Sequence, residues 1–278
     1  MINVFNDKNN ISYYDSIEEF TNFIDNSTSM RYNSSDDRDF DFSGTHSLKE
    51  ASELCKYGDE ELASYISQQS LTFDSVDTVN KIRRSTINDV VGFIPNVPNY
   101  VIGIPTNMIR DNRNIINSKV INIFISISAA WHISKEDIKE RCAKYIAAIN
   151  SLEEQGYRCN VYSGSVGTNY DKIYNLLVIK IKSDKEPLNL AKMAFPLAHP
   201  SMLRRLKFRW METIPLDFGS GYGQSITNEK KINELLKPIF NNTKFTILSV
   251  SEEPGKIGDI VDILKKKGLV NDDSKKNS

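Results

Sequence analysis

The chain has 278 residues, of which 40% are hydrophobic and 26% are charged, and its formal net charge is -1. This balance supports a sizeable buried core and excludes an intrinsically disordered protein. The three cysteines, Cys55, Cys142 and Cys159, lie far apart and form no CxxC pair, so the sequence indicates neither a zinc site nor a disulfide framework. The first residues do not resemble a signal peptide, and no stretch reaches 18 apolar residues. We therefore expect a cytoplasmic protein.

The charge is unevenly distributed along the chain. Residues 1–90 contain 8 Lys+Arg and 17 Asp+Glu, a net charge of -9. This leaves 27 Lys+Arg and 19 Asp+Glu, a net charge of +8, for residues 91–278. Two interpretations remain open: a solvated acidic arm beside an ordinary domain, or an acidic segment that shields or competes for a basic surface.

Residues 1–90 are predicted to form an acidic, mostly helical and irregular N-terminal arm. Helices are expected over residues 16–25, 48–54 and 59–69. Ser47 is suited to cap the second helix, and Glu50 follows at the position that closes a capping box. Residues 26–41 contain four Asp and almost no aliphatic side chain, which is typical of a loop or a disordered link.

Residues 91–118 are predicted to form an extended crossing segment. The apolar run over residues 89–105 contains three prolines and two glycines, which exclude a long helix and a central strand. Apolar extended segments are usually covered by other parts of a protein. We therefore expect a buried segment that ties the N-terminal arm onto the following domain; lining a groove is the alternative.

Residues 119–267 are predicted to form an α/β domain. The β-branched run over residues 119–128 is typical of a buried strand that is central in its sheet. A helix is expected next, beginning after Ser134 and ending before Gly156, because a capping residue and a stop signal bound a stripe of apolar residues at spacings of three and four. This strand and helix lead into a further strand over residues 157–163.

Residues 164–170 are glycine-rich and are predicted to form a hairpin loop before a second strand over residues 173–183. A phosphate-binding loop is disfavoured, because the segment has no lysine and is followed by a strand instead of a helix N-terminus. The rest of the domain is expected to contain helices opening at Pro187 and near Met202, a helix over 228–239, a strand over 244–251 and a helix over 256–267. Residues 268–278 are a polar tail.

A basic cluster lies in the helix around residues 202–210. It comprises Arg204, Arg205, Lys207 and Arg209, next to Trp210. Such side chains suit phosphate binding with a stacking aromatic. However, four charges in six residues wrap around a helix, so a solvated face or bridges to the acidic arm are the favoured interpretation.

The order of elements from residue 119 onward resembles the start of a von Willebrand factor A-type domain. The resemblance implies a three-layer, Rossmann-like α/β fold with helices on both faces of the sheet, and a first strand that ends in a metal-binding Asp-x-Ser-x-Ser. Here the matching residues are Phe124-Ile125-Ser126-Ile127-Ser128, so both serines are present and Phe124 replaces the aspartate. Because a divalent ion would lose its strongest hard-oxygen ligand, we expect no metal and no cofactor.

Three further stretches resemble an uncharacterised family of proteins encoded by tailed bacteriophages. They are Phe42-Ser43-Gly44-Thr45 with the helix after it, the unit over residues 125–162, and Phe195-Pro196-Leu197-Ala198-His199-Pro200-Ser201-Met202-Leu203-Arg204-Arg205. The resemblance implies a phage origin, and therefore a location in the host cytoplasm or the virion. It implies no reaction.

The sequence gives little support to an enzyme, because it contains no HExxH, GxSxG or GKS/T motif. The favoured prediction is a non-enzymatic phage accessory or structural protein that binds a phage or host protein partner at the carboxyl ends of its strands, where open α/β sheets form crevices. The candidate crevice residues are Ser126, Ser128, Trp131, His132, His199 and Asp217. The alternative is a nucleic-acid-binding or nucleic-acid-processing protein that uses the basic cluster.

Overall fold

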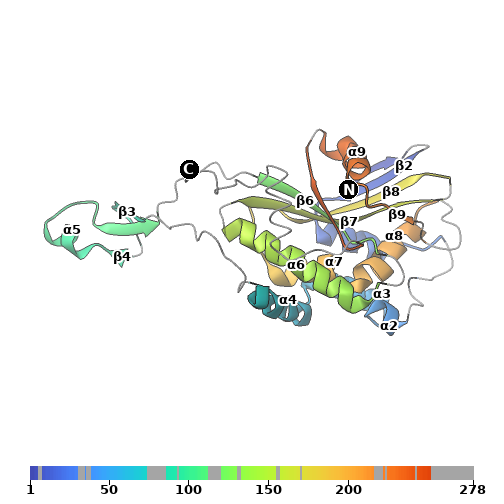
Figure 1. The fold of residues 1–278 in the computed structure, drawn as a ribbon, viewed down its shortest axis with the longest axis horizontal. Coiled ribbons are helices and arrows are strands. Elements are labelled where there is room, and N and C mark those ends of the chain that lie inside the picture. Colours follow the sequence, from blue (N-terminus) through green and yellow to red (C-terminus); the bar gives the residue numbers. More distant parts are fainter. Residues whose placement is uncertain are drawn as a thin grey trace, which may run out of the picture.

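The computed structural model describes residues 1–5, 8–30, 35, 39–73, 86–92, 94–111, 120–129, 133–154, 157–169, 171–215, 222, 224–241 and 243–251, and the statements below concern these residues. They form a mixed seven-stranded sheet with helices on both faces, and a smaller three-stranded sheet (Figure 1). The general α/β class expected from the sequence is therefore confirmed.

The large sheet has the order β1-β2-β8-β7-β6-β10, with β9 paired to β7. The strands are β1 (Ile2–Phe5), β2 (Asn9–Tyr14), β6 (Val120–Ser126), β7 (Arg158–Thr168), β8 (Tyr174–Lys182), β9 (Gln224–Ser225) and β10 (Thr246–Ser249). β6 runs parallel to both β7 and β10, whereas β7 and β8 form an antiparallel hairpin. The predicted central position of the first strand of the α/β unit is thus confirmed.

The helices cover the two faces of this sheet unequally. One core contains Ile121, Ile123 and Ile125 of β6 together with α1 (Ile17–Asn26), α3 (Leu48–Tyr57), α4 (Glu60–Phe73), α6 (Lys135–Glu154), α7 (Leu190–Ala198), the π-helix η1 (Met202–Lys207) and α8 (Phe208–Glu212). The second core contains Phe124 and α9 (Glu229–Phe240). Alternate side chains of β6 therefore face opposite layers, and Figure 1 shows α9 alone above the sheet.

Serine caps begin three of these helices. The hydroxyls of Ser16, Ser47 and Ser134 each accept a hydrogen bond of 3.0 Å from the backbone N–H three residues later. The stripe predicted for α6 is buried, comprising Ile138, Cys142, Tyr145, Ile146, Ile149 and Leu152. None of the helices in the described ranges is both long and apolar enough to cross a membrane.

The N-terminal residues differ from the predicted separate arm. Residues 2–14 supply β1 and β2, and β2 pairs in parallel with β8 of the same sheet. Phe20 and Ile24 of α1 and Cys55 of α3 are buried in the larger core. Residues 1–73, where described, therefore belong to the α/β body, and their acidic side chains are at least partly exposed except for that of Asp59, which is buried.

The glycine-rich segment after residue 163 also differs from the prediction. β7 continues to Thr168, so Gly164 and Gly167 lie in the strand instead of a loop. A Cβ atom at Gly164 would collide with the carbonyl oxygen of Leu177 and the ring of Phe124. The glycine is needed because neighbouring strands approach closely there.

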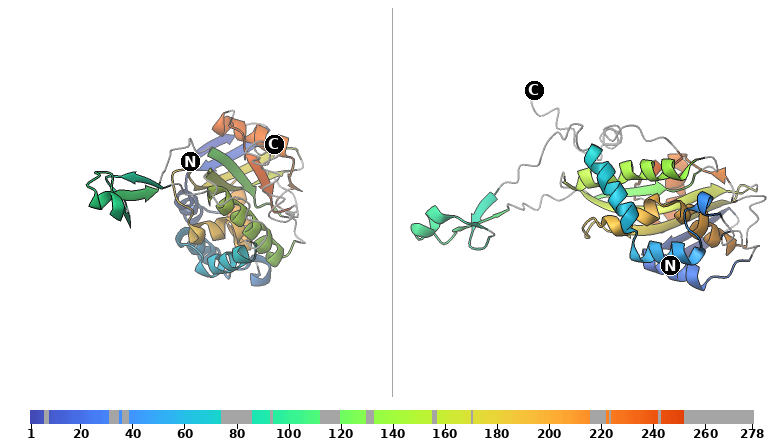
Figure 2. Two further views of the ribbon diagram at one scale, coloured as in Figure 1. Left: turned by 60° about the vertical axis from the view of Figure 1, so that its left-hand side comes forward. Right: turned by 90° about the horizontal axis from the view of Figure 1, so that it is seen from below.

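Residues 86–92 and 94–111 form a small separate unit, which we call the projecting module. Its elements are β3 (Thr86–Asp89), β4 (Ile94–Pro95), α5 (Val97–Val101) and β5 (Met108–Asp111). β5 lies between β3 and β4 and is antiparallel to both. Figures 1 and 2 show the module well away from the body. The predicted buried crossing segment is therefore wrong where it is described. The predicted helix over residues 256–267 lies outside the described residues.

Candidate functional site

The carboxyl ends of β6 and β10 lie at the place where an open α/β sheet usually binds ligands. α6, which follows β6 in the chain, packs on one face of the sheet, and α9, which precedes β10, packs on the other face. The chain connections of these two neighbouring strands therefore lie on opposite faces of the sheet, which is the arrangement that forms a ligand crevice in open α/β sheets. Internal contacts occupy much of this edge. The Ser251 hydroxyl donates to the Ser128 carbonyl at 2.5 Å, and the Tyr145 hydroxyl donates to the Ser249 carbonyl at 2.8 Å.

The two serines of the predicted crevice are both buried. The Ser128 hydroxyl bonds to the backbone N–H and carbonyl of Val166 at 3.2 Å, so it joins β6 to β7. The Ser126 hydroxyl has no hydrogen-bond partner in the described part of the chain. Neither hydroxyl is presented to solvent.

His199 does not lie beside Ser126 and Ser128 in a common crevice. Its ring stacks on Phe195 with centroids 4.5 Å apart, and its Nδ1 accepts a 3.1 Å hydrogen bond from the Ser201 backbone N–H. Burial lowers the pKa of His199 to about 3. His199 follows α7 on one face of the sheet, whereas Ser126 lies two residues after Phe124 in β6 and so faces the other side, toward α9. Trp131, His132 and Asp217 lie outside the described residues.

The predicted basic patch is a buried cluster. Its members are only 0–6% exposed: Arg204, Arg205, Lys207 and Arg209. Arg204 donates to the carbonyls of Phe42 and Ile133, both at 2.6 Å, and lies 4.2 Å over the Phe42 ring. The interpretation as an exposed phosphate-binding or solvated face is therefore wrong, because these side chains are turned into the protein.

The cluster and its neighbour Glu212 fasten Ser35 and the segment over residues 42–45 to η1 and α8. Arg205 donates to the carbonyls of Ser35 and Thr45 at 2.9 and 2.7 Å. The arginines thus bind the N-terminal region, as the bridging interpretation expected, but these contacts go to backbone oxygens. Burial lowers the pKa of Lys207 to about 8. Sequence spacing gave no signal for this arrangement, since the partners are 160 or more residues apart.

Glu212 is a further buried member that the sequence analysis missed. Its carboxylate accepts from the Ser35 N–H and hydroxyl at 3.0 and 2.7 Å, and from the Tyr222 hydroxyl at 2.7 Å. Nothing in the local sequence distinguishes this glutamate from a surface residue. The buried hydrogen bonds indicate a structural role for it.

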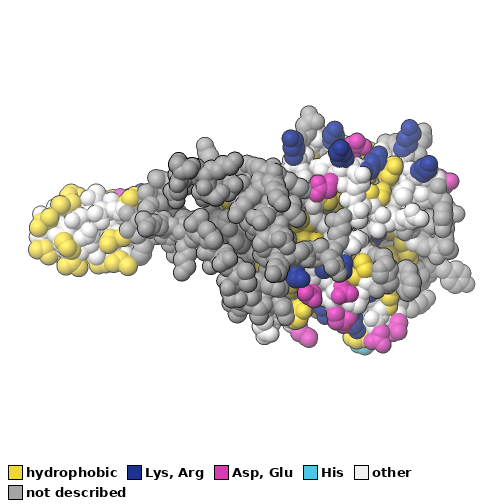
Figure 3. Space-filling model, in the orientation of Figure 1, with side chains coloured by type: hydrophobic (Ala, Val, Ile, Leu, Met, Phe, Trp, Pro, Cys, Tyr) yellow, Lys and Arg dark blue, Asp and Glu magenta, His cyan; other side chains and the backbone are white. Residues whose placement is uncertain are grey.

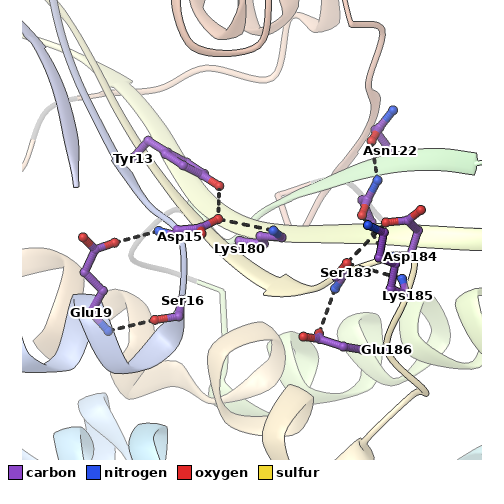
Figure 4. A network of polar contacts seen from close by, with 11 residues as sticks. Tyr13, Asp15, Ser16, Glu19, Asn122, Lys180, Ser183, Asp184, Lys185 and Glu186 are labelled. Carbon is purple, nitrogen blue, oxygen red and sulfur yellow. Dashed lines mark hydrogen bonds and ion pairs between the residues drawn. The ribbon is translucent and has the colours of Figure 1, made fainter.

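An open groove of about 710 Å³ lies beside the start of α1. Its charged lining mixes signs, with Asp15, Glu18, Glu186, Lys56, Lys180 and Lys192. Figure 4 shows Asp15 accepting from the Tyr13 hydroxyl at 2.7 Å and from Lys180 at 3.2 Å. The hydrogen bond from Tyr13 is the main reason that the pKa of Asp15 is lowered. Because the lining carries both signs of charge and Asp15 pairs with Lys180, the groove indicates no particular ligand charge.

Reactive and metal-binding groups are not assembled in the described ranges. No group of three or more His, Cys, Asp or Glu side chains there is placed to hold a metal ion. The cysteines are buried, and burial raises the pKa of Cys159 to about 12, which keeps its thiol protonated at neutral pH.

The projecting module has the most unusual surface. Twenty consecutive residues, 90–109, contain no charged side chain and no histidine. Eight large apolar residues of the module are 37–75% exposed: Val90, Val91, Ile94, Val97, Tyr100, Val101, Ile102 and Ile104. No side chain described between residues 87 and 110 is buried. Figure 3 shows these apolar side chains covering the end of the module.

Polar contacts hold the module together in place of a core. The Asn96 side chain donates to the Asn88 side chain at 3.0 Å, and the Asn99 side chain donates to the Thr106 carbonyl at 3.1 Å. Arg110 and Asp89 form an ion pair across β3 and β5. The polar groups therefore point toward one another, and the apolar side chains are left at the surface.

Fold and surface together define an α/β protein with a mixed sheet and an apolar projecting module. The chain belongs to a family described as a domain of unknown function (DUF7192), whose model matches residues 4–271 and so includes both the body and the module. Neither the curated proteins nor the solved structures contain a match to this chain.

Proposed function

We propose that the protein is a non-enzymatic accessory or structural protein of a tailed bacteriophage, and that it binds a protein partner through the projecting module. One observation carries the proposal: the module exposes eight large apolar side chains and has no buried side chain in its described part. Exposed apolar patches of this kind mark interaction sites, because water disfavours them unless a partner covers them.

The size of the module supports the need for a partner. A chain segment of this length seldom buries enough apolar surface to be stable alone, and a few short strands need a packed face for stability. The apolar side chains that could form such a packed face in the described module are all at least partly exposed to solvent. A partner that covers it would supply the missing core.

The body is proposed to resemble a von Willebrand factor A-type domain. Supporting this, the strands β8-β7-β6-β10 follow the order 3-2-1-4 of a doubly wound sheet, and helices lie on both of its faces. Phe124, at the position of the metal-binding aspartate, is packed in the core beneath α9. The residue present is thus an apolar core residue and does not suit a metal ligand.

The basic cluster does not support the nucleic-acid alternative as a second candidate function. Phosphate binding requires cationic groups that reach solvent, and Arg204, Arg205, Lys207 and Arg209 are buried.

Copurification from cells tests the proposal. The tagged wild-type chain and a Tyr100→Asp variant would be expressed together with an untagged copy of the chain in phage-infected host cells. We expect the wild-type chain to retain one protein in stoichiometric amount, and the variant to lose it, because the new carboxylate would have to be buried in the contact. Retention of the same proteins by both forms would overturn the proposal.

A further inference from the structure

We infer that the partner of the projecting module is the same module of a second copy of this chain, so that two chains form a closed two-fold dimer. This inference rests on the proposed function, since it identifies the partner that the same surface binds. Three features of the described residues carry it: the exposed area, the absence of charge, and the lack of a comparable apolar surface on the body.

The exposed area matches one side of a specific interface. From their exposed fractions, the eight apolar residues present on the order of 800 Å², which is the area each partner contributes to an interface of standard size. A contact that covered all eight residues on both modules would bury about twice that area. No additional surface is needed for a stable dimer.

The absence of charge suits contact between identical surfaces. In a two-fold interface, residues close to the axis meet their own copies, so a charged side chain there would face a like charge. Residues 90–109 contain no charged side chain and avoid this repulsion entirely. A contact with a different protein would more commonly use complementary charges to select its partner.

The described residues of the body offer no equivalent apolar surface. The other exposed large apolar residues in the described ranges are spread over several elements: Met1, Ile2, Phe5, Met30, Phe40, Tyr57, Tyr65 and Val120. The largest group is the three at β1, at an edge of the sheet. Binding of a module to these residues would be a head-to-tail contact, which generates a ring or an open filament. The contact of module with module closes after two chains.

A lipid surface fits the module less well. Asn88, Asn96, Asn99 and Asn107 lie among its apolar residues, and the small sheet has unpaired edges at β3 and β4. Polar side chains and unpaired backbone groups are costly in hydrocarbon, whereas a second protein surface can provide hydrogen-bond partners. The twenty uncharged residues also contain no cation to attract anionic lipid headgroups.

Sedimentation equilibrium of the purified full-length chain tests the inference. The chain has a mass of 31.6 kDa, and we expect the wild-type protein to approach twice this mass as its concentration rises. Tyr100→Asp should weaken the self-association by roughly 100-fold or more, the effect of losing a central aromatic contact. Tyr57→Asp is the matched control, because Tyr57 on α3 is 76% exposed and Tyr100 on α5 is 70% exposed.

The outcomes separate this inference from the proposed function. Dimeric wild-type and Tyr57→Asp proteins with a monomeric Tyr100→Asp protein support the inference; Val101→Asp should repeat the result if Tyr100→Asp changes the circular dichroism spectrum. A monomeric wild-type chain at every concentration, a mass that grows without limit, or dissociation of the Tyr57→Asp control would overturn it. A monomeric wild-type chain that still retains a different protein in cells would leave the proposed function standing.

Discussion

The buried arginine cluster and the projecting module reverse the usual positions of charged and apolar side chains. In the body, Arg204, Arg205, Lys207 and Arg209 are only 0–6% exposed, whereas eight apolar residues of the module are 37–75% exposed. The buried arginines are stabilised within one chain, because backbone carbonyls elsewhere in the body accept their hydrogen bonds. The apolar side chains of the module have no cover in the described part of the chain. The arginine cluster therefore finds its partners within one molecule, whereas the apolar side chains of the module need a second molecule to cover them.

The largest expected effect is on folding, and it should differ between an isoleucine of the body and an isoleucine of the module. Ile123 of β6 is fully buried, so Ile123→Asp should abolish soluble folded protein, since burying an unpaired carboxylate costs several kcal/mol, on the order of the stability of a domain. Ile102→Asp in the module, where the side chain is 69% exposed, should leave the melting temperature of the body unchanged. Thermal melts by circular dichroism measure both. A folded Ile123→Asp protein with an unchanged melt would contradict the central position of β6.

The next effect concerns the arginines themselves. Arg205→Ala should lower the free energy of unfolding by roughly 3 kcal/mol, because the buried carbonyls of Ser35 and Thr45 lose a charged donor. Arg110→Ala is the control in the module. Its ion pair with Asp89 is partly exposed, so the loss should stay below about 1 kcal/mol. Urea denaturation measures the loss of unfolding free energy in each variant. Equal losses in Arg205→Ala and Arg110→Ala would contradict the view that only the buried arginines stabilise the protein strongly.

The next effect depends on pH, and over a single pH unit it is smaller than the loss expected for Arg205→Ala. The unfolded chain binds a proton at His199 below about pH 6.5, whereas the folded chain, whose His199 pKa is lowered to about 3, does not bind it until the pH is much lower. Stability should therefore fall as the pH falls from 6.5 toward 3, by up to roughly 1.4 kcal/mol per pH unit from this residue. His199→Gln keeps an acceptor for the Ser201 N–H and does not titrate. Its unfolding free energy should fall less over the same range than that of the wild-type protein.

The smallest effect is expected for salt acting on self-association. Because residues 90–109 carry no charge, the dimer dissociation constant should change little with ionic strength. Sedimentation equilibrium at low and high salt measures this dependence. Steep weakening with added salt would show that charged surfaces of the body, instead of the module, form the contact.

The α/β unit could be predicted from the sequence because its signals are local. The apolar run of β6, the cap at Ser134 and the spacing of buried residues in α6 all lie within one continuous stretch. β1 and β2 were missed because Asn9, Asn10 and Ser12 make the strand β2 look polar. Their assignment depends on β8, which lies far along the chain.

The candidate sites were harder to predict for a related reason. The burial of Arg204 and Arg205 depends on carbonyls that lie 71 to 170 residues away, and a basic run by itself is typical of a surface. The module was expected to be buried because apolar segments usually are. Its described residues are exposed, and the cover that we infer for them is another copy of the chain.

Hydrogen–deuterium exchange over residues 94–104, measured at increasing concentrations of the wild-type chain, tests the inferred dimer most directly. If the modules form the dimer, these amides exchange rapidly in dilute solution and become protected as the dimer forms, while the same amides in Tyr100→Asp stay unprotected at every concentration. Amides of β6 should be protected throughout. Exchange in residues 94–104 that does not depend on the concentration of the wild-type chain would contradict the account.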